Sequence, residues 1–159
     1  MKRIAATVVA VLLSGAATVA SAQVPSYGPS VTLDQAKRAI AAGQAEARKN
    51  GWPVAIAVFD TAGQLVAFEK MDDTQTASID VAQDKGRSAV IFRRPTKVFE
   101  DLVAGGGAGT RILGLRGASP IEGGMPIMAG GKVIGGIGVS GVTSQQDGVV
   151  AKAGADALK

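Results

Sequence analysis

The fold is decided by the stretch SPIEGGMPIM at residues 119–128 and by VIGGIGVSG at residues 133–141. The second segment is rich in β-branched residues and predicts a strand, which pairs with residues 125–129 through a turn at Gly130 and Gly131. Strict alternation divides this strand into two faces. One face carries Val133, Gly135, Ile137 and Val139, and the other carries Ile134, Gly136, Gly138 and Ser140. Because the second face is almost bare backbone beyond its first residue, a helix, another subunit or a flat ligand can come very close to it.

Residues 1–22 predict a secretory signal peptide. Lys2 and Arg3 give a positive start, residues 4–13 are apolar, and residues 20–22 read Ala-Ser-Ala. This arrangement is typical of a cleaved export signal, and its apolar run is too short for a membrane span. We therefore expect a periplasmic or secreted protein cut after Ala22, with an extended arm at residues 23–30 and one domain at residues 31–159.

Composition excludes several classes of function. The chain has no cysteine, so an exported form has no disulfides. It also has no histidine, which excludes Ser-His-Asp catalysis, the usual zinc sites and the commonest haem ligand. The expected mature chain has 15 basic and 13 acidic residues, a net charge of +2. The basic cluster Arg93, Arg94 and Lys97 has few aromatic neighbours, which favours a solvated helix end over a nucleic-acid site.

Hydrophobic periodicity predicts an α+β domain with a single, mainly antiparallel sheet. The expected order is a helix, two strands, two helices, a glycine-rich segment, a hairpin and a final helix. Residues 105–117 contain six glycines and predict a mobile loop or irregular hairpin around a short strand at 111–115. The last helix is expected to be capped by Ser144, with Asp147 completing a capping box. The predicted ranges of the other elements are 33–50, 54–59, 64–70, 77–91 and 96–104.

A few side chains are candidates for chemistry, and each also has a simpler interpretation. Glu122 precedes two glycines, where it is either a surface turn residue or a carboxyl group with a raised pKa. Lys85 is either an anion contact or unusual metal ligand, or a side chain that reaches to solvent from an apolar stripe. Asp80 and Asp84 can share a cation, although helix capping and a solvated helix face explain them more simply. The glycines at 105–109 and 130–131 lack a phosphate-loop signature and are read as connections.

The same segments resemble a known family. Pro120, the Gly123-Gly124 pair and Pro126-Ile127, followed by Gly131-x-Val-Ile-Gly-x-Ile-Gly-Val-Ser-Gly141, are similar to GlcG/HbpS-like proteins, a group that also supplies the C-terminal domain of PduO-type proteins. The resemblance implies a profilin-like α+β fold and a ring-like homo-oligomer, often an octamer. It also implies haem binding or breakdown in some members. Because this chain has no histidine, haem iron would have to take Met, Lys, Tyr, Thr or Glu.

The sequence therefore predicts an exported, oligomeric protein that binds haem or another flat, tetrapyrrole-like ligand. The alternatives are an enzyme acting on a small acid or carbonyl compound, with Glu122 as acid or base and Lys85 as its electrostatic partner, and a structural or regulatory oligomer without a ligand. No zinc, nucleotide or nucleic acid is expected. In the haem hypothesis the glycine pair lets the ligand reach the backbone, two basic side chains meet the propionates, and a methionine is the axial ligand. The predicted site residues are Met71, Lys85, Arg87, Glu122, Gly123, Gly124 and Met125.

Overall fold

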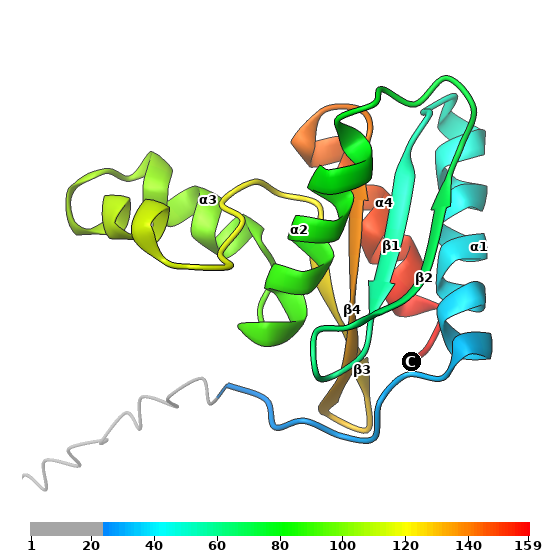
Figure 1. The fold of residues 1–159 in the computed structure, drawn as a ribbon, viewed down its shortest axis with the longest axis horizontal. Coiled ribbons are helices and arrows are strands. Elements are labelled where there is room, and N and C mark those ends of the chain that lie inside the picture. The colour runs from blue at the N-terminus through cyan, green and yellow to red at the C-terminus, as the bar shows by residue number, and fades with distance from the viewer. Residues whose placement is uncertain (1–23) are drawn as a thin grey trace, which may run out of the picture.

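A four-stranded antiparallel sheet with helices on both faces forms the centre of the molecule (Figure 1). The structure is a computed structural model that describes residues 24–159; the predicted signal peptide lies outside the described residues. The strand order is β2-β1-β4-β3, so β2 and β3 are the edge strands. This is the predicted α+β class. The elements are α1 (Leu33–Asn50), β1 (Ala55–Phe59), β2 (Leu65–Lys70), α2 (Ser78–Ile91), α3 (Lys97–Ala104), the 3₁₀ helix η1 (Gly107–Gly114), β3 (Gly124–Ala129), β4 (Lys132–Ser140) and α4 (Ser144–Asp156).

Strand β1 is buried on both faces, as its continuous apolar run predicts. Ile56 and Val58 pack with residues of α1 and α4, whereas Ala55, Ala57 and Phe59 pack on the other face with residues of α2. Figure 1 shows α2 on one side of the sheet, with α1 and α4 on the other. The fold therefore has three layers, with small residues where the helices approach the sheet.

The bare face of β4 is covered by α2. A Cβ atom at Gly136 would lie 2.6 Å from the Gly86 carbonyl oxygen, and one at Gly138 would overlap the Ala82 carbonyl oxygen and the Gly86 nitrogen. Glycines on the helix and on the strand thus let the two backbones touch. Of the three occupants that the sequence allowed for this face, the structure shows the helix.

A β-bulge in β4 changes the predicted faces at the start of this strand. Ile127 of β3 pairs with Gly135, but the next residue, Met128, pairs with Val133, so Ile134 is an extra residue in β4. Val133 consequently packs on the α2 side and Ile134 on the side of α1 and α4. The strict alternation predicted for these two residues was therefore wrong.

Helices α1 and α4 begin with capping boxes, one of them displaced from the expected position, whereas α2 and α3 begin without a side-chain cap hydrogen bond. Thr32 and Gln35 form the predicted capping box of α1. In α4 the capping residues are Thr143 and Gln146, one position before the predicted pair Ser144 and Asp147. The overlapping patterns Thr-x-x-Gln and Ser-x-x-Asp compete here. Because the helix is capped by Thr143 and Gln146, the carboxylate of Asp147 is not used in a capping box and points into the protein.

Residues 97–121 form a projection, which we define as α3, η1 and the loop that follows them. The glycine-rich part is not the predicted mobile loop or hairpin, because residues 107–114 form the 3₁₀ helix η1. Gly109 lies so close to α3 that a Cβ atom would overlap the Leu102 carbonyl oxygen. Figure 1 shows this unit standing away from the sheet. Glycine at position 109 lets η1 pack closely against α3. The glycine content of the segment alone does not predict this packing.

The segment before α1 is extended and attached along its length. Gly28 donates to the Val133 carbonyl at 2.8 Å, so the segment lies beside β4. The Tyr27 hydroxyl donates to the Val90 carbonyl at 2.9 Å, and the Arg93 guanidinium lies over the Tyr27 ring. Arg93 therefore fixes this segment to the end of α2 and is more than a solvated helix end.

Candidate functional site

Lys85 and Asp147 form a buried ion pair beneath the end of β4. Their side chains are 2% exposed, and Lys85 Nζ donates to Asp147 Oδ2 at 2.8 Å and to the Val139 carbonyl at 3.1 Å. Asp147 Oδ1 also accepts a hydrogen bond from the Val142 backbone at 3.2 Å. Of the two interpretations of Lys85, extension to solvent is therefore wrong. Its ammonium group joins α2 to α4 inside the protein.

The Gly123-Gly124 pair lies directly on this ion pair. Gly123 has φ +127°, and a Cβ atom there would lie 2.9 Å from Lys85 Nζ and 2.9 Å from Asp147 Cβ. At Gly124 a Cβ would overlap the Lys85 carbonyl oxygen, and the Gly124 nitrogen donates to Thr96 Oγ1 at 2.9 Å. The protein's own atoms use the space that these glycines leave, so within one chain no flat ligand can lie against them.

Glu122 lies beside the Lys85–Asp147 ion pair and the Gly123-Gly124 pair. Its backbone nitrogen donates to Glu100 Oε2 at 2.6 Å, which ties the projection to the body of the molecule. Its carboxyl group rests on Gly148 of α4, where a Cβ would overlap Oε1. The other oxygen, Oε2, is buried and has no hydrogen-bond partner. This arrangement places an incompletely satisfied carboxyl group about one helical turn from the start of α4.

Burial raises the pKa values of both carboxyl groups near Lys85, those of Glu122 and Asp147. Burial raises the pKa of Glu122, and the nearby Glu100 carboxylate raises it further, while Lys97 opposes the rise. Burial also raises the pKa of Asp147, against the opposing hydrogen bond and charge of Lys85. The raised pKa suggested by the sequence for Glu122 thus has a physical cause. The direct contact with Lys85 keeps Asp147 suited to a structural ion pair.

The predicted site residues do not form one site within a chain. Met71 follows the edge strand β2, whereas Met125 lies on β3 at the opposite edge of the sheet. Arg87 is exposed on α2 and its Nε donates to the Gly63 carbonyl at 3.3 Å. The structure brings together Lys85, Glu122, Gly123 and Gly124, whereas the side chain of the next residue, Met125, packs against the core on the α1 and α4 side of the sheet.

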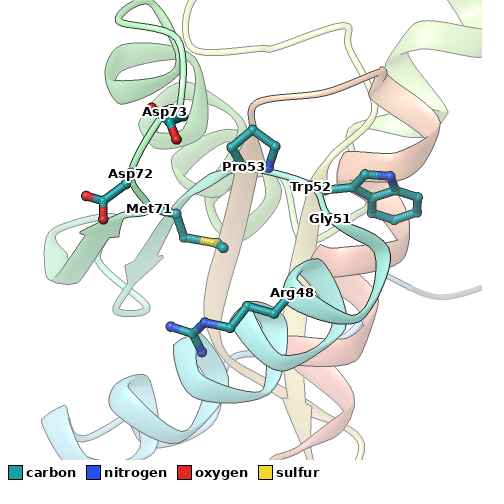
Figure 2. Close-up of a pocket in the computed structure, with 7 residues that line it drawn as sticks. All are labelled: Arg48, Gly51, Trp52, Pro53, Met71, Asp72 and Asp73. Atoms are coloured by element: carbon teal, nitrogen blue, oxygen red, sulfur yellow. The ribbon is translucent and has the colours of Figure 1, made fainter.

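Met71 instead lines an open groove at the C-terminal end of α1, which we call the Arg48–Met71 groove. The groove has a volume of about 360 Å³. Figure 2 shows the Met71 thioether and the Arg48 side chain converging on one hollow, while the Trp52 indole points away from it. A neighbouring hollow of about 390 Å³ shares Arg48, Met71 and Asp72 and extends the groove along β2. The groove is lined by Arg48, Gly51, Trp52, Pro53, Met71, Asp72 and Asp73.

Arg48 was not among the predicted residues. It lies in the last turn of α1, where a basic residue is explained by the helix dipole alone. In the structure Arg48 Nη2 donates to Gln44 Oε1 at 2.9 Å, and Gln44 Nε2 donates to Glu69 Oε2 at 2.7 Å. This chain of contacts orients the guanidinium toward the groove. No local sequence signal marks a residue whose role depends on a strand 21 positions away.

Residues 24–159 contain neither a cluster of metal-ligating side chains nor a helix that could span a membrane. In this range no group of three or more acidic, histidine or cysteine side chains is placed to hold a metal ion. No helix among these residues is long and apolar enough to cross a membrane.

Comparison with known proteins identifies the family. The family described as "Haem degrading protein HbpS-like" matches residues 31–156. The chain belongs to the HbpS-like family. It is 44% identical to GlcG of Escherichia coli K12 over 110 residues, which cover 69% of this chain and 81% of GlcG.

Solved structures of HbpS-like proteins have the same fold. A double mutant of HbpS from Streptomyces reticuli matches with a TM-score of 0.76 and 28% identity, covering 98% of this chain and 99% of that one. A complex of PduOC with haem matches with a TM-score of 0.73 and 25% identity, covering 82% of this chain and 96% of that one. The arrangement of one antiparallel sheet between helices is therefore the fold of HbpS-like proteins.

Proposed function

We propose that this protein is exported and, as a homo-oligomer, binds haem or a closely related tetrapyrrole in the Arg48–Met71 groove. The observation that carries the proposal is the convergence of a thioether and a guanidinium on one open hollow (Figure 2). The glycine pair cannot be this site within one chain, because the protein's own atoms fill its surface. The proposal thus keeps the predicted ligand class and the predicted Met71, but moves the site.

The donor set of the groove suits a carboxylated metalloporphyrin. A methionine thioether is a known axial ligand of haem iron, and arginine pairs with carboxylates through two parallel hydrogen bonds. Asp72 and Asp73 line the same groove and repel carboxylates, so the propionates are expected on the Arg48 side. When bound, haem would supply an iron centre for redox and oxygen chemistry. The residues of this chain would bind and orient it.

The comparisons support the ligand class. The family description refers to haem degradation, and a structural neighbour is a complex with haem. The signal-like residues 1–22 support export, and the family resemblance supports assembly into an oligomer. These supports are independent of the groove geometry.

Hemin titration of the protein without a histidine tag tests the proposal. A tag must be absent because its imidazoles would themselves bind iron. We expect a saturable Soret shift at micromolar protein. Arg48→Gln should weaken binding about 10-fold, the value of one charge-assisted hydrogen bond, and Arg87→Gln should not change it. The absence of a saturable shift would contradict the proposal and favour a structural or regulatory oligomer without a ligand.

A second candidate function rests on the buried, unpartnered Oε2 of Glu122. A carboxyl group with a raised pKa can exchange protons with a small acid or carbonyl substrate, and Lys85 nearby would stabilise negative charge. A screen of small carboxylic acids and carbonyl compounds, followed by Glu122→Gln, tests this function. Turnover lost in Glu122→Gln, with the assembly intact, would support it. Turnover that is unchanged in this variant would exclude it.

A further inference from the structure

Exposed apolar side chains gather on the projection. Five of the ten large hydrophobic residues that are exposed within residues 24–159 lie between residues 97 and 121, at 38–67% exposure. A monomer in water gains nothing from such a cluster, and contiguous apolar surface commonly marks an interaction site. The projection stands away from the sheet (Figure 1), so its exposed apolar side chains are open to contact with another molecule. The five residues are Val98, Leu102, Leu113, Leu115 and Ile121.

The charges of the projection match a second surface on the same molecule. Residues 105–118 contain Arg111 and Arg116 and no acidic residue, and both arginines are exposed. The exposed residues of α2 are Asp80, Asp84 and Arg87, and the Arg87 Nε donates to the Gly63 carbonyl. In the described part of the chain neither the two arginines of residues 105–118 nor the two aspartates of α2 take part in an ion pair. One molecule therefore presents an apolar projection with two exposed arginines and, on α2, a surface with two exposed aspartates.

The acidic surface is also concave. Asp84 lines a hollow of about 340 Å³ together with residues 117–120, between α2 and the last loop of the projection. A hollow with a carboxylate in its wall is suited to an inserted arginine side chain, the residue type most enriched at interfaces together with the aromatics. The hollow and the two exposed arginines are therefore complementary in charge and shape.

We propose that the projection of one copy of this chain packs on the acidic face of α2 of a second copy. The inference extends the homo-oligomer of the proposed function by assigning its contact surface. Arg111 and Arg116 meet Asp80 and Asp84, and the five exposed apolar side chains of the projection are buried beside them. Every copy carries both the projection and the acidic face of α2. Two copies can therefore contact each other symmetrically in a dimer, or successive copies can contact each other head to tail around a closed ring.

A charge exchange tests this contact. The protein is purified from cells that express the full chain, and its mass is measured by native mass spectrometry and light scattering. We expect that R111E/R116E and D80R/D84R each weaken self-association about 100-fold, because like charges then face one another. A mixture of the two variants should assemble again, since each surface now finds its opposite. K37E/R38E, a charge reversal on the exposed face of α1, should assemble like the unchanged protein.

The other outcomes contradict the contact. A protein that is monomeric before any substitution, or variants that assemble unchanged, would show that the projection has a different partner. Failure of the mixture to assemble would show that the charges do not face one another. Circular dichroism confirms that each variant is folded. Hemin titration of the same samples separates this result from a failure of the haem proposal.

Discussion

At the residue scale, the buried pair Lys85–Asp147 dominates the polar interior. Removing one partner leaves a buried charge without compensation, so Lys85→Met should lower the free energy of unfolding by about 3–5 kcal/mol. The double variant Lys85→Met/Asp147→Leu should lose much less than the sum of its single changes. Urea denaturation of the three variants gives the coupling energy. Additive losses would mean that the two side chains do not act as a pair.

The carboxyl group of Glu122 makes stability depend on pH. Its pKa is raised on folding, so the folded state holds the proton more tightly than the unfolded state does. Glu122 therefore stabilises the folded state fully at pH values below the pKa of the unfolded state. This stabilisation is lost as the pH rises through the higher pKa of the folded state. Glu122→Gln should flatten the fall in stability above about pH 4.5, leaving the part of the same sign that is due to Asp147. Equal pH slopes in both proteins, measured by urea denaturation, would refute the burial of this charge.

Sequence alone could single out Glu122 and the glycine pair, because a carboxylate before two glycines is locally unusual. It could not identify the partner of Lys85. The two residues are 62 positions apart, and Asp147 already had a sufficient explanation as a capping residue. Only the choice of the earlier capping box, at Thr143 and Gln146, releases the carboxylate for the interior.

At the element scale, the contact between α2 and β4 depends on glycine. Gly138→Ala should destabilise the protein by about 3 kcal/mol or more, because the added methyl group meets backbone atoms that cannot move aside. Gly114→Ala is the matched control, since a Cβ there meets nothing within 4 Å. Thermal and urea unfolding of both variants give the comparison. A Gly138→Ala protein as stable as the control would mean that α2 does not touch the strand.

Most helices and strands follow from periodicity, because amphipathic stripes and apolar runs are local properties. Periodicity does not predict the bulge at Ile134 or the 3₁₀ helix η1. The bulge is a property of how β3 and β4 align, and η1 forms because its glycines allow it to pack on α3. Both depend on a partner element, which a local pattern does not contain.

At the scale of the whole molecule, the sequence predicts one sheet between helices but not where a ligand would lie. The bare face of β4 suggested a ligand surface, and α2 covers it. The Arg48–Met71 groove is instead assembled from the end of α1, the segment before β1 and the segment after β2. Residues from three separate segments of the chain meet there, so no single sequence motif predicts the groove.

The haem proposal is tested most directly by comparing two methionine variants in hemin titrations. Met71 lines the groove and Met125 lies at the opposite edge of the sheet, so the pair is a matched test of position. We expect Met71→Leu to shift the Soret band of the complex and to weaken binding at least about 10-fold, with Met125→Leu indistinguishable from the unchanged protein. An unchanged spectrum and affinity in Met71→Leu would contradict a haem site in this groove.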